Sequence, residues 1–170
     1  MAFPPEAFLI GAQKAGTTFL ARLLDQQPGV ALAQPKEPDF FTRYWERGLE
    51  WYRERFPETD GNVVLDATTS YSVAPLHLDD PDTTDRERSR LAGVPRRIRD
   101  VSPSARFIYV LREPVERIWS AYWHEVRNGS EERPLEEVFE RDPMYRNASD
   151  YLGQIRQYER YFPLDRMLFL

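Results

Sequence analysis

The 170-residue chain has no cysteine and only two histidines. The absence of cysteine excludes disulfides, thiolate metal ligands and cysteine nucleophiles, and two widely separated histidines do not have the spacing of a zinc site. No apolar run approaches the ~20 residues that a membrane-spanning helix needs, and residues 1–5 lack the charged and apolar regions of a signal peptide. We therefore expect a metal-free chain without a membrane span, located in the cytoplasm.

The chain also lacks an excess of positive charge, since its net charge at neutral pH is −5. Nucleic acids and heparin-like polymers bind basic surfaces, so this charge argues against either as a partner of the whole surface, and we expect no nucleic-acid partner. Any site for a polyanion must therefore be locally basic. With 41% hydrophobic and 14% aromatic residues, the composition fits one folded domain.

The start of the chain carries the strongest local pattern. The apolar run Ala7–Ile10 leads into a turn framed by Gly11 and Gly16, and apolar residues at helical spacing follow. This order predicts a buried strand, a turn and a helix. Backbone N–H groups at such a helix N-terminus favour a bound phosphate or sulfate, although a structural strand-turn-helix has the same pattern.

The turn differs from the nucleotide-binding pattern G-x-x-x-x-G-K-[ST], in which a lysine follows the second glycine. Thr17 occupies that position here, and Lys14 lies inside the turn, three residues after Gly11. An anion would therefore meet this lysine from another side than in a nucleoside triphosphatase. The segment favours anion binding in general and disfavours an ATPase.

A second strand-to-helix passage lies near residue 112. Residues 106–111 are typical of a buried strand, and apolar residues recur along one face of the following helix, at Val115, Ile118, Trp119, Tyr122, Trp123 and Val126. Arg112 is then expected at the carboxyl end of the strand and Ser120 two turns into the helix, where both suit a phosphate. Alternatively, Arg112 pairs with Glu113 or Glu116, and Ser120 bonds within its own helix.

Strands and helices alternate along the whole chain. Strands are predicted at 7–11, 29–33, 62–66, 106–111 and 166–170, and helices at 17–26, 47–56, 95–101, 115–127, 135–141 and 150–162. Such alternation favours an α/β fold in which a mostly parallel central sheet has helices on both faces.

The two anion-binding motifs, in this order, resemble the sulfotransferases that use 3′-phosphoadenosine 5′-phosphosulfate, especially the branch of heparan sulfate sulfotransferases and bacterial relatives. Residues 14–18 are similar to the family pattern (K/R)-x-G-T-(T/R), which binds the 5′-phosphosulfate end of the donor, and residues 107–122 to the segment that binds its 3′-phosphate. The resemblance implies a P-loop-like three-layer fold, adenosine 3′,5′-bisphosphate as the product and no metal. It assigns donor binding to Gln13, Lys14, Ala15, Gly16, Thr17, Thr18, Arg112 and Ser120.

The resemblance also suggests the catalytic groups. Lys14 would act on the bridging oxygen of the leaving phosphate, where charge develops, or would only bind charge in the ground state. Glu37, in residues 34–41, matches the glutamate of the family pattern K-E-x-x-F-F, which is the catalytic base in the heparan sulfate branch. The other interpretation of Glu37 is a solvated loop carboxylate beside Lys36.

One segment departs from the family. Residues 64–71 resemble the pattern E-K-(T/S)-P-x-Y, but Ala67 stands where the heparan sulfate branch has a second lysine. Asp66 keeps an acid at the neighbouring position, and the hydroxyls at 68–70 either bind a sulfate or acceptor or cap a turn. The acceptor hydroxyl or amine thus remains open among carbohydrates, lipids and small metabolites. Tyr44, Trp45, Trp51 and Tyr52 either line an acceptor cleft or belong to the core.

Family members continue beyond the point that matches Leu170, so residues 1–170 are expected to be a single sulfotransferase domain that lacks its C-terminal part. We expect this form to be poorly active by itself. Two alternatives have other sequence requirements. A small-molecule kinase needs Mg²⁺ ligands and a lysine after Gly16, and a nucleotide-binding module without turnover needs no catalytic base.

Overall fold

The computed structural model describes residues 3–57, 63–76 and 90–170. Five strands form one sheet in the order β2-β3-β1-β4-β5, and every described pairing is parallel. The strands are β1 (Ala7–Gly11), β2 (Val30–Leu32), β3 (Val63–Ala67), β4 (Arg106–Tyr109) and β5 (Met167–Phe169). The prediction of a parallel α/β sheet is therefore confirmed.

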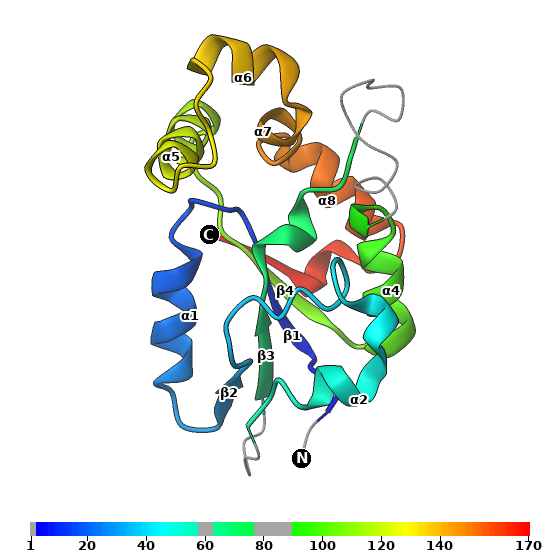
Figure 1. Cartoon of the computed structure of the whole chain (residues 1–170). Coiled ribbons are helices and arrows are strands. Elements are labelled where there is room, and N and C mark those ends of the chain that lie inside the picture. The colour runs from blue at the N-terminus through cyan, green and yellow to red at the C-terminus, as the bar shows by residue number, and fades with distance from the viewer. Residues whose placement is uncertain (1–2, 58–62, 77–89) are drawn as a thin grey trace.

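The helices form two layers around this sheet and a group beyond its carboxyl edge (Figure 1). α1 (Thr17–Asp25) covers one face, and α2 (Gly48–Arg53), α4 (Val94–Val101) and α8 (Tyr151–Glu159) cover the other. Beyond the carboxyl ends of the strands lie α5 (Pro114–Arg127), α6 (Leu135–Arg141) and α7 (Pro143–Asn147). The result is a three-layer fold in which helices partly cover the edge of the sheet formed by the carboxyl ends of its strands.

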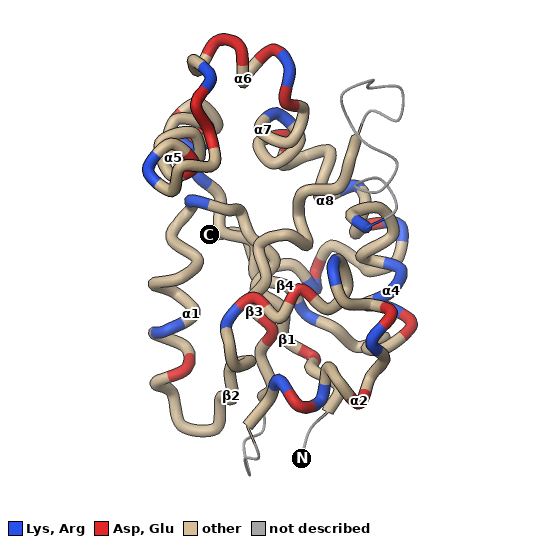
Figure 2. Tube along the Cα trace, viewed as in Figure 1, with Lys and Arg blue, Asp and Glu red and all other residues tan. Residues whose placement is uncertain are grey.

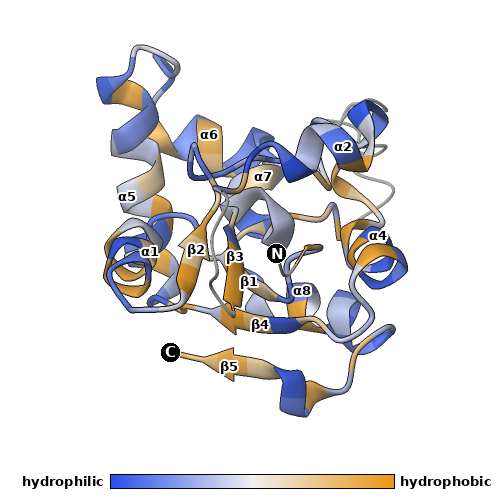
Figure 3. Cartoon of the chain, turned by 90° about the horizontal axis from the view of Figure 1, so that it is seen from below, coloured by the Kyte–Doolittle hydropathy of each residue, from blue (hydrophilic) through white to orange (hydrophobic). Residues whose placement is uncertain are grey.

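Apolar strands separate two cores of unequal size, as the hydropathy colours of Figure 3 show. The smaller core lies under α1 and includes Leu9, Ala21 and Leu65. The larger core lies on the other face and includes the stacked rings of Phe40 and Tyr52, whose centroids are 4.2 Å apart. Because β1, β3, β4 and β5 bury residues in the larger core and β2 buries Leu32 in the smaller one, the sheet fixes the positions of the loops at its carboxyl edge.

The aromatic residues near position 50 belong mainly to this larger core. Tyr52 is fully buried, and Trp45 and Trp51 pack against the core from its rim. The Arg47 guanidinium covers the rings of Tyr44 and Trp51. The structure therefore favours the core interpretation of these rings over an acceptor cleft.

Element boundaries differ from the sequence prediction mostly at the ends. The helix predicted at 47–56 is a 3-10 turn at Trp45–Arg47 followed by the short α2, and the helix predicted at 150–162 ends at Glu159. The short helix α7 was not predicted, because its five residues are too few to show the apolar periodicity of a helix.

Only part of the apolar stripe seen in the sequence is covered on α5, where Ile118 and Tyr122 pack against a small core with Val138 and Tyr145. Val115, Trp119 and Trp123 are 71%, 53% and 41% exposed, whereas Arg117 and Ala121 are buried. α5 lies beyond the edge of the sheet rather than against its face, and it packs toward α7, where the Arg117 side chain bonds the backbone carbonyl of Tyr145. The periodicity identified the helix but only part of the side that is covered.

Candidate functional site

The turn between β1 and α1 needs glycine at both ends. Gly11 has φ of +145°, and a Cβ atom at this position would collide with Ser72 Oγ. Gly16 has φ of +91° and stands at the N-cap of α1, where no side chain caps the helix. Lys14 between them also adopts a left-handed φ of +69°, which is uncommon for a residue with a side chain.

A cavity of about 410 Å³ opens at this N-terminus of α1. The N–H groups of the first helical turn have no intrahelical acceptor, and the helix dipole makes this end positive. Burial lowers the pKa of Lys14, and the charges of Arg127 and Arg112 lower it further against the opposing effect of Glu125. The cavity lining consists of Gln13, Lys14, Gly16, Thr17, Thr18, Glu37, Thr69 and His124.

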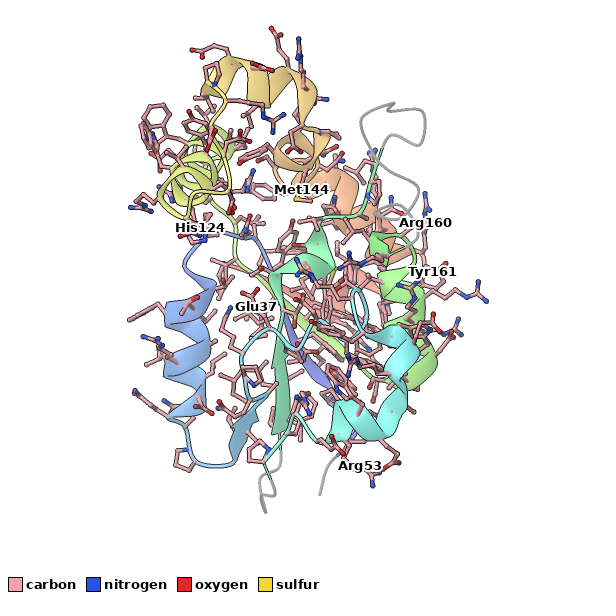
Figure 4. The ribbon with its side chains drawn as sticks, in the orientation of Figure 1. Glu37, Arg53, His124, Met144, Arg160 and Tyr161 are labelled. Atoms are coloured by element: carbon pink, nitrogen blue, oxygen red, sulfur yellow. The ribbon has the colours of Figure 1, made fainter. Side chains whose placement is uncertain are left out.

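Glu37 lies in the same cavity as Lys14, so the fold brings the two residues predicted as catalytic together. The segment after β2 places it there, because the Glu37 N–H bonds the carbonyl of Ala67 at 3.1 Å. Its side chain is 39% exposed and pairs with Lys36 Nζ. The pair with Lys36 agrees with the interpretation of Glu37 as a loop carboxylate beside that lysine. Glu37 nevertheless lines the cavity as well. Figure 4 shows Glu37 and His124 at the same end of the sheet.

A smaller cavity of about 180 Å³ adjoins the first one and shares Gln13, Glu37 and Thr69 with it. Asp39 lines it with a φ of +53° and accepts a 2.6 Å hydrogen bond from Ser70 Oγ. Glu37 also has a left-handed φ, of +62°. Within the described ranges, Lys14, Glu37 and Asp39 are the residues other than glycine with positive φ, and all three line these two cavities.

The three hydroxyl residues at the end of β3 have separate roles. Thr69 lines both cavities, and Ser70 lines the smaller one while bonding Asp39. Thr68 is fully buried and donates to Asp66. Of the interpretations left open by the sequence, facing a ligand thus fits Thr69 and Ser70, and a purely internal hydrogen bond fits Thr68.

Asp66 is a fully buried acid directly behind the site. It accepts hydrogen bonds from Tyr52 Oη at 2.6 Å, from Tyr71 Oη at 2.9 Å and from Thr68. Desolvation raises the pKa of Asp66 to about 6, although the three hydroxyl donors act in the opposite direction. Tyr71 Oη also accepts from the Phe41 N–H at 3.4 Å. This network ties the end of β3 to the segment that carries Glu37.

Arg112 and Ser120 are placed as the sequence predicted, at the end of β4 and within α5. The Arg112 guanidinium donates to the Lys14 carbonyl at 3.0 Å and contacts Glu116 at 3.3 Å, so the predicted pairing with Glu116 is present. Arg112 is thereby hydrogen-bonded to the turn between Gly11 and Gly16. The described lining of the large cavity includes neither residue, nor Ala15, which packs against the larger core. A role for any of the three in donor binding stays a prediction.

Sequence reasoning missed several residues of the site. His124 lies four residues after Ser120 on α5. The sequence did carry a signal for it, because residues four apart lie on the same face of a helix. Asp39 and Met144 carried no such signal, because their positions depend on a left-handed turn and on the unpredicted helix α7.

Charges of both signs are interspersed over the described chain (Figure 2). Within the described ranges, no group of three or more His, Asp or Glu side chains could hold a metal ion. In the same part of the chain, no helix combines the length and the apolar character needed to span a bilayer.

Comparisons with known proteins agree with this geometry. The profile of the sulfotransferase domain family matches residues 4–170. The chain is 40% identical over 119 residues to human heparan sulfate glucosamine 3-O-sulfotransferase 6, covering 69% of this chain and 30% of the relative. It is 31% identical over 181 residues to human heparan sulfate glucosamine 3-O-sulfotransferase 3B1, covering 98% and 40%. A Dictyostelium discoideum protein, membrane-associated sulfotransferase kil1, is 30% identical over 164 residues, covering 92% and 31%.

A solved structure has the same fold. The crystal structure of a sulfotransferase from Alicyclobacillus acidocaldarius superposes with a TM-score of 0.77 at 24% identity, over 98% of this chain and 72% of that one. The chain spans about 30–40% of the length of the curated relatives that it matches.

Proposed function

Because the chain belongs to the sulfotransferase domain family, we propose that it transfers a sulfuryl group from 3′-phosphoadenosine 5′-phosphosulfate to a hydroxyl or amine of an acceptor. One observation carries this proposal: Lys14 and Glu37 line the same cavity at the N-terminus of α1. A cation and helix N–H groups suit the anionic end of a donor, and a carboxylate suits the proton of an acceptor.

The donor supplies a sulfuryl group whose bond to the 5′-phosphate oxygen breaks as the acceptor oxygen or nitrogen bonds to sulfur. Glu37 takes the acceptor proton in this step, and the Lys14 ammonium stabilises the charge that develops on the leaving phosphate. The backbone of Gly16, Thr17 and Thr18 holds the phosphosulfate end. Arg112, which precedes α5, and Ser120, within α5, are assigned to the 3′-phosphate. No residue in this scheme requires a metal.

The acceptor is proposed to enter through the smaller cavity, since that cavity is lined by Glu37 but by no residue of α1. A carbohydrate acceptor agrees with the names of the heparan sulfate relatives. The lining of the smaller cavity carries both signs of charge, with Glu37 and Asp39 beside Arg43 and Arg90, so it has no net positive charge to attract a sulfated polymer. The cytoplasmic location expected from the sequence stays part of the proposal.

Donor binding is tested by titration with adenosine 3′,5′-bisphosphate, ATP, and ATP with Mg²⁺. We expect the bisphosphate to bind without metal, and ATP to bind weakly with or without Mg²⁺. Tight binding of ATP only with Mg²⁺ would instead support a kinase. Bisphosphate binding without any transfer would support a non-catalytic module.

Lys14→Ala should reduce transfer by about 10²–10³, the usual loss of one preorganised donor to developing charge, and should weaken bisphosphate binding much less. Arg99→Ala, an exposed position on α4, is the control for removal of a cation. Transfer is measured with sulfur-labelled donor. Unchanged turnover in Lys14→Ala would show that this lysine does not stabilise the charge on the leaving phosphate.

Glu37→Gln should reduce transfer by about 10²–10⁴, the range for a general base, and leave bisphosphate affinity unchanged, because the side chain keeps its size. Glu50→Gln on the exposed side of α2 controls for loss of one negative charge. Transfer that does not depend on Glu37 would mean that another group accepts the proton.

A further inference from the structure

The segment that carries Glu37 has a strained backbone. Glu37 and Asp39 adopt left-handed φ angles of +62° and +53°. This conformation is unfavourable for a residue with a side chain and persists only where the surrounding structure holds it. The segment crosses the carboxyl end of β3 after leaving β2 (Figure 1). Its contacts there therefore decide where the Glu37 side chain lies.

Two adjacent buried rings anchor this segment to the larger core. The Phe40 ring stacks on Tyr52 with centroids 4.2 Å apart. The Phe41 ring lies edge-on to Tyr71, with centroids 5.6 Å apart. The backbone of Phe41 is held on both sides, because its N–H donates to Tyr71 Oη at 3.4 Å and its carbonyl accepts from Arg97 at 2.8 Å.

One buried carboxylate holds both of these tyrosines. Asp66 Oδ2 accepts from Tyr52 Oη at 2.6 Å and from Tyr71 Oη at 2.9 Å, and Thr68 donates to Oδ1. A phenol has one proton, so Tyr71 donates it to Asp66 and offers only lone pairs to the Phe41 N–H. Without an acceptor at position 66 that proton would be free to turn, and the orientation of the Tyr71 hydroxyl would no longer be fixed.

Other contacts hold the segment nearer to Glu37. The Glu37 N–H bonds the carbonyl of Ala67, the last residue of β3, at 3.1 Å. Ser70 Oγ donates to Asp39 Oδ1 at 2.6 Å and lies 2.9 Å from Thr42 Oγ1. Contacts to β3 and to the turn after it thus hold the segment at its beginning, middle and end.

We propose that Asp66 is a positioning residue, which fixes residues 37–42 through Tyr71 and so places the Glu37 side chain at the donor cavity. Asp66 is fully buried, so it acts through Tyr71 rather than by touching a ligand. The consequence for catalysis rests on the proposed transfer function, because a misplacement of about 1 Å can cost about 10²-fold in rate. The placement of the segment does not depend on that function.

Two phenol-to-phenyl variants form a matched pair for the test. Tyr71→Phe and Tyr52→Phe each remove one hydroxyl that donates to Asp66, and each keeps its ring. Only Tyr71→Phe also removes the acceptor of the Phe41 N–H. Amide hydrogen exchange of the whole chain, measured by NMR and corrected for intrinsic exchange rates, gives the protection of each N–H group.

In Tyr71→Phe the protection of the Phe41 and Glu37 amides should fall by about three- to tenfold relative to that of the Val110 amide, the size of one net hydrogen bond. The Val110 amide is the reference because it donates to the Gly11 carbonyl at 2.8 Å, away from the segment. A general loss of stability would lower all three protections together. In Tyr52→Phe we expect no selective change.

Variants of Asp66 itself provide a rescue test. Asp66→Ala should show the same selective loss of protection as Tyr71→Phe. Asp66→Asn should restore it, because the amide oxygen still accepts from both phenols. The tyrosine pair keeps the proposal testable if Asp66→Ala does not fold.

Release of labelled sulfate from the donor, with water as the acceptor, measures the effect on rate. In this step the bond from sulfur to the 5′-phosphate oxygen breaks, the water oxygen bonds to sulfur, and Glu37 takes a water proton. Tyr71→Phe should slow the release by about 10–10²-fold at saturating donor and leave the affinity for adenosine 3′,5′-bisphosphate unchanged. Tyr52→Phe should change neither quantity.

Equal relative protection of the Phe41 amide in Tyr71→Phe and Tyr52→Phe would overturn the positioning role. Selective loss of protection without a change in Glu37-dependent hydrolysis would overturn it as well. Hydrolysis that is absent from the unaltered chain, or that Glu37→Gln leaves unchanged, would instead refute the proposed transfer. Selective exchange in Tyr71→Phe would in that case still support the placement of residues 37–42 by Asp66.

Discussion

Asp66 and Arg117 are both buried charged side chains beside the carboxyl edge of the sheet. They differ in how many hydrogen-bond partners their charged groups have. Three hydroxyl groups donate to Asp66, from Tyr52, Thr68 and Tyr71. Arg117 has two acceptors for five N–H donors, and a cavity beside it.

The two groups also respond differently to burial. A carboxylate can take up a proton, and the pKa of Asp66 is raised to about 6. A guanidinium cannot release its proton at any pH a protein tolerates, so only an anion can compensate Arg117. The closed network around Asp66 indicates a structural role, whereas some N–H groups of Arg117 have no acceptor in the described part of the chain.

Asp66→Ala should give the largest effect on stability, a loss of about 3–5 kcal/mol in the free energy of unfolding. Two tyrosine hydroxyls and the Thr68 hydroxyl would lose their acceptor inside the core, at about 1–3 kcal/mol for each buried unsatisfied group. Denaturant unfolding at pH 7 measures the loss, with the isosteric Asp66→Asn as control. A loss below about 1 kcal/mol would show that the network is not closed as described.

The pH dependence of stability should give the next largest effect. The folded pKa of Asp66 is about 6 and its ordinary value is 3.8, so the native state holds this proton more tightly than the unfolded state. The contribution of Asp66 is thus most favourable below about pH 4 and is lost as the pH rises to about 6, by about 3 kcal/mol.

Asp66→Asn lacks this titration. The unfolding free energy of the unaltered chain, minus that of Asp66→Asn, should therefore fall between pH 4 and pH 7. Denaturant unfolding at several pH values gives this difference. A difference that is constant or rises with pH would contradict the raised pKa.

Arg117→Met should have the smallest effect, a loss of less than about 2 kcal/mol. The variant loses two hydrogen bonds but removes a buried charge without a counterion, and the two changes oppose each other. Ser149→Ala should cost more in the unaltered chain than in Arg117→Met, because only there does it leave Nε without an acceptor. If Arg117→Met were as destabilising as Asp66→Ala, Arg117 would be a structural residue like Asp66.

Much of the fold followed from local patterns. The runs at 7–11 and 106–111, each followed by an amphipathic segment, gave the strand-helix units that carry Lys14 and Arg112. The site was less predictable, because the lining of the large cavity alone comes from four separate segments. Glu37 was found only through a resemblance, and His124 and Asp39 were missed.

The sequence by itself determined the parallel sheet, the glycine-framed turn and the presence of a cation there, because apolar periodicity and glycine act over a few residues. Only the tertiary structure decided which charges share a cavity. Glu37 shares a cavity with Lys14 because its backbone N–H bonds the carbonyl of Ala67 at the end of β3. Val115, Trp119 and Trp123 of α5 are exposed while Arg117 is buried, because the covered face of a helix depends on its neighbours as well as on its own periodicity.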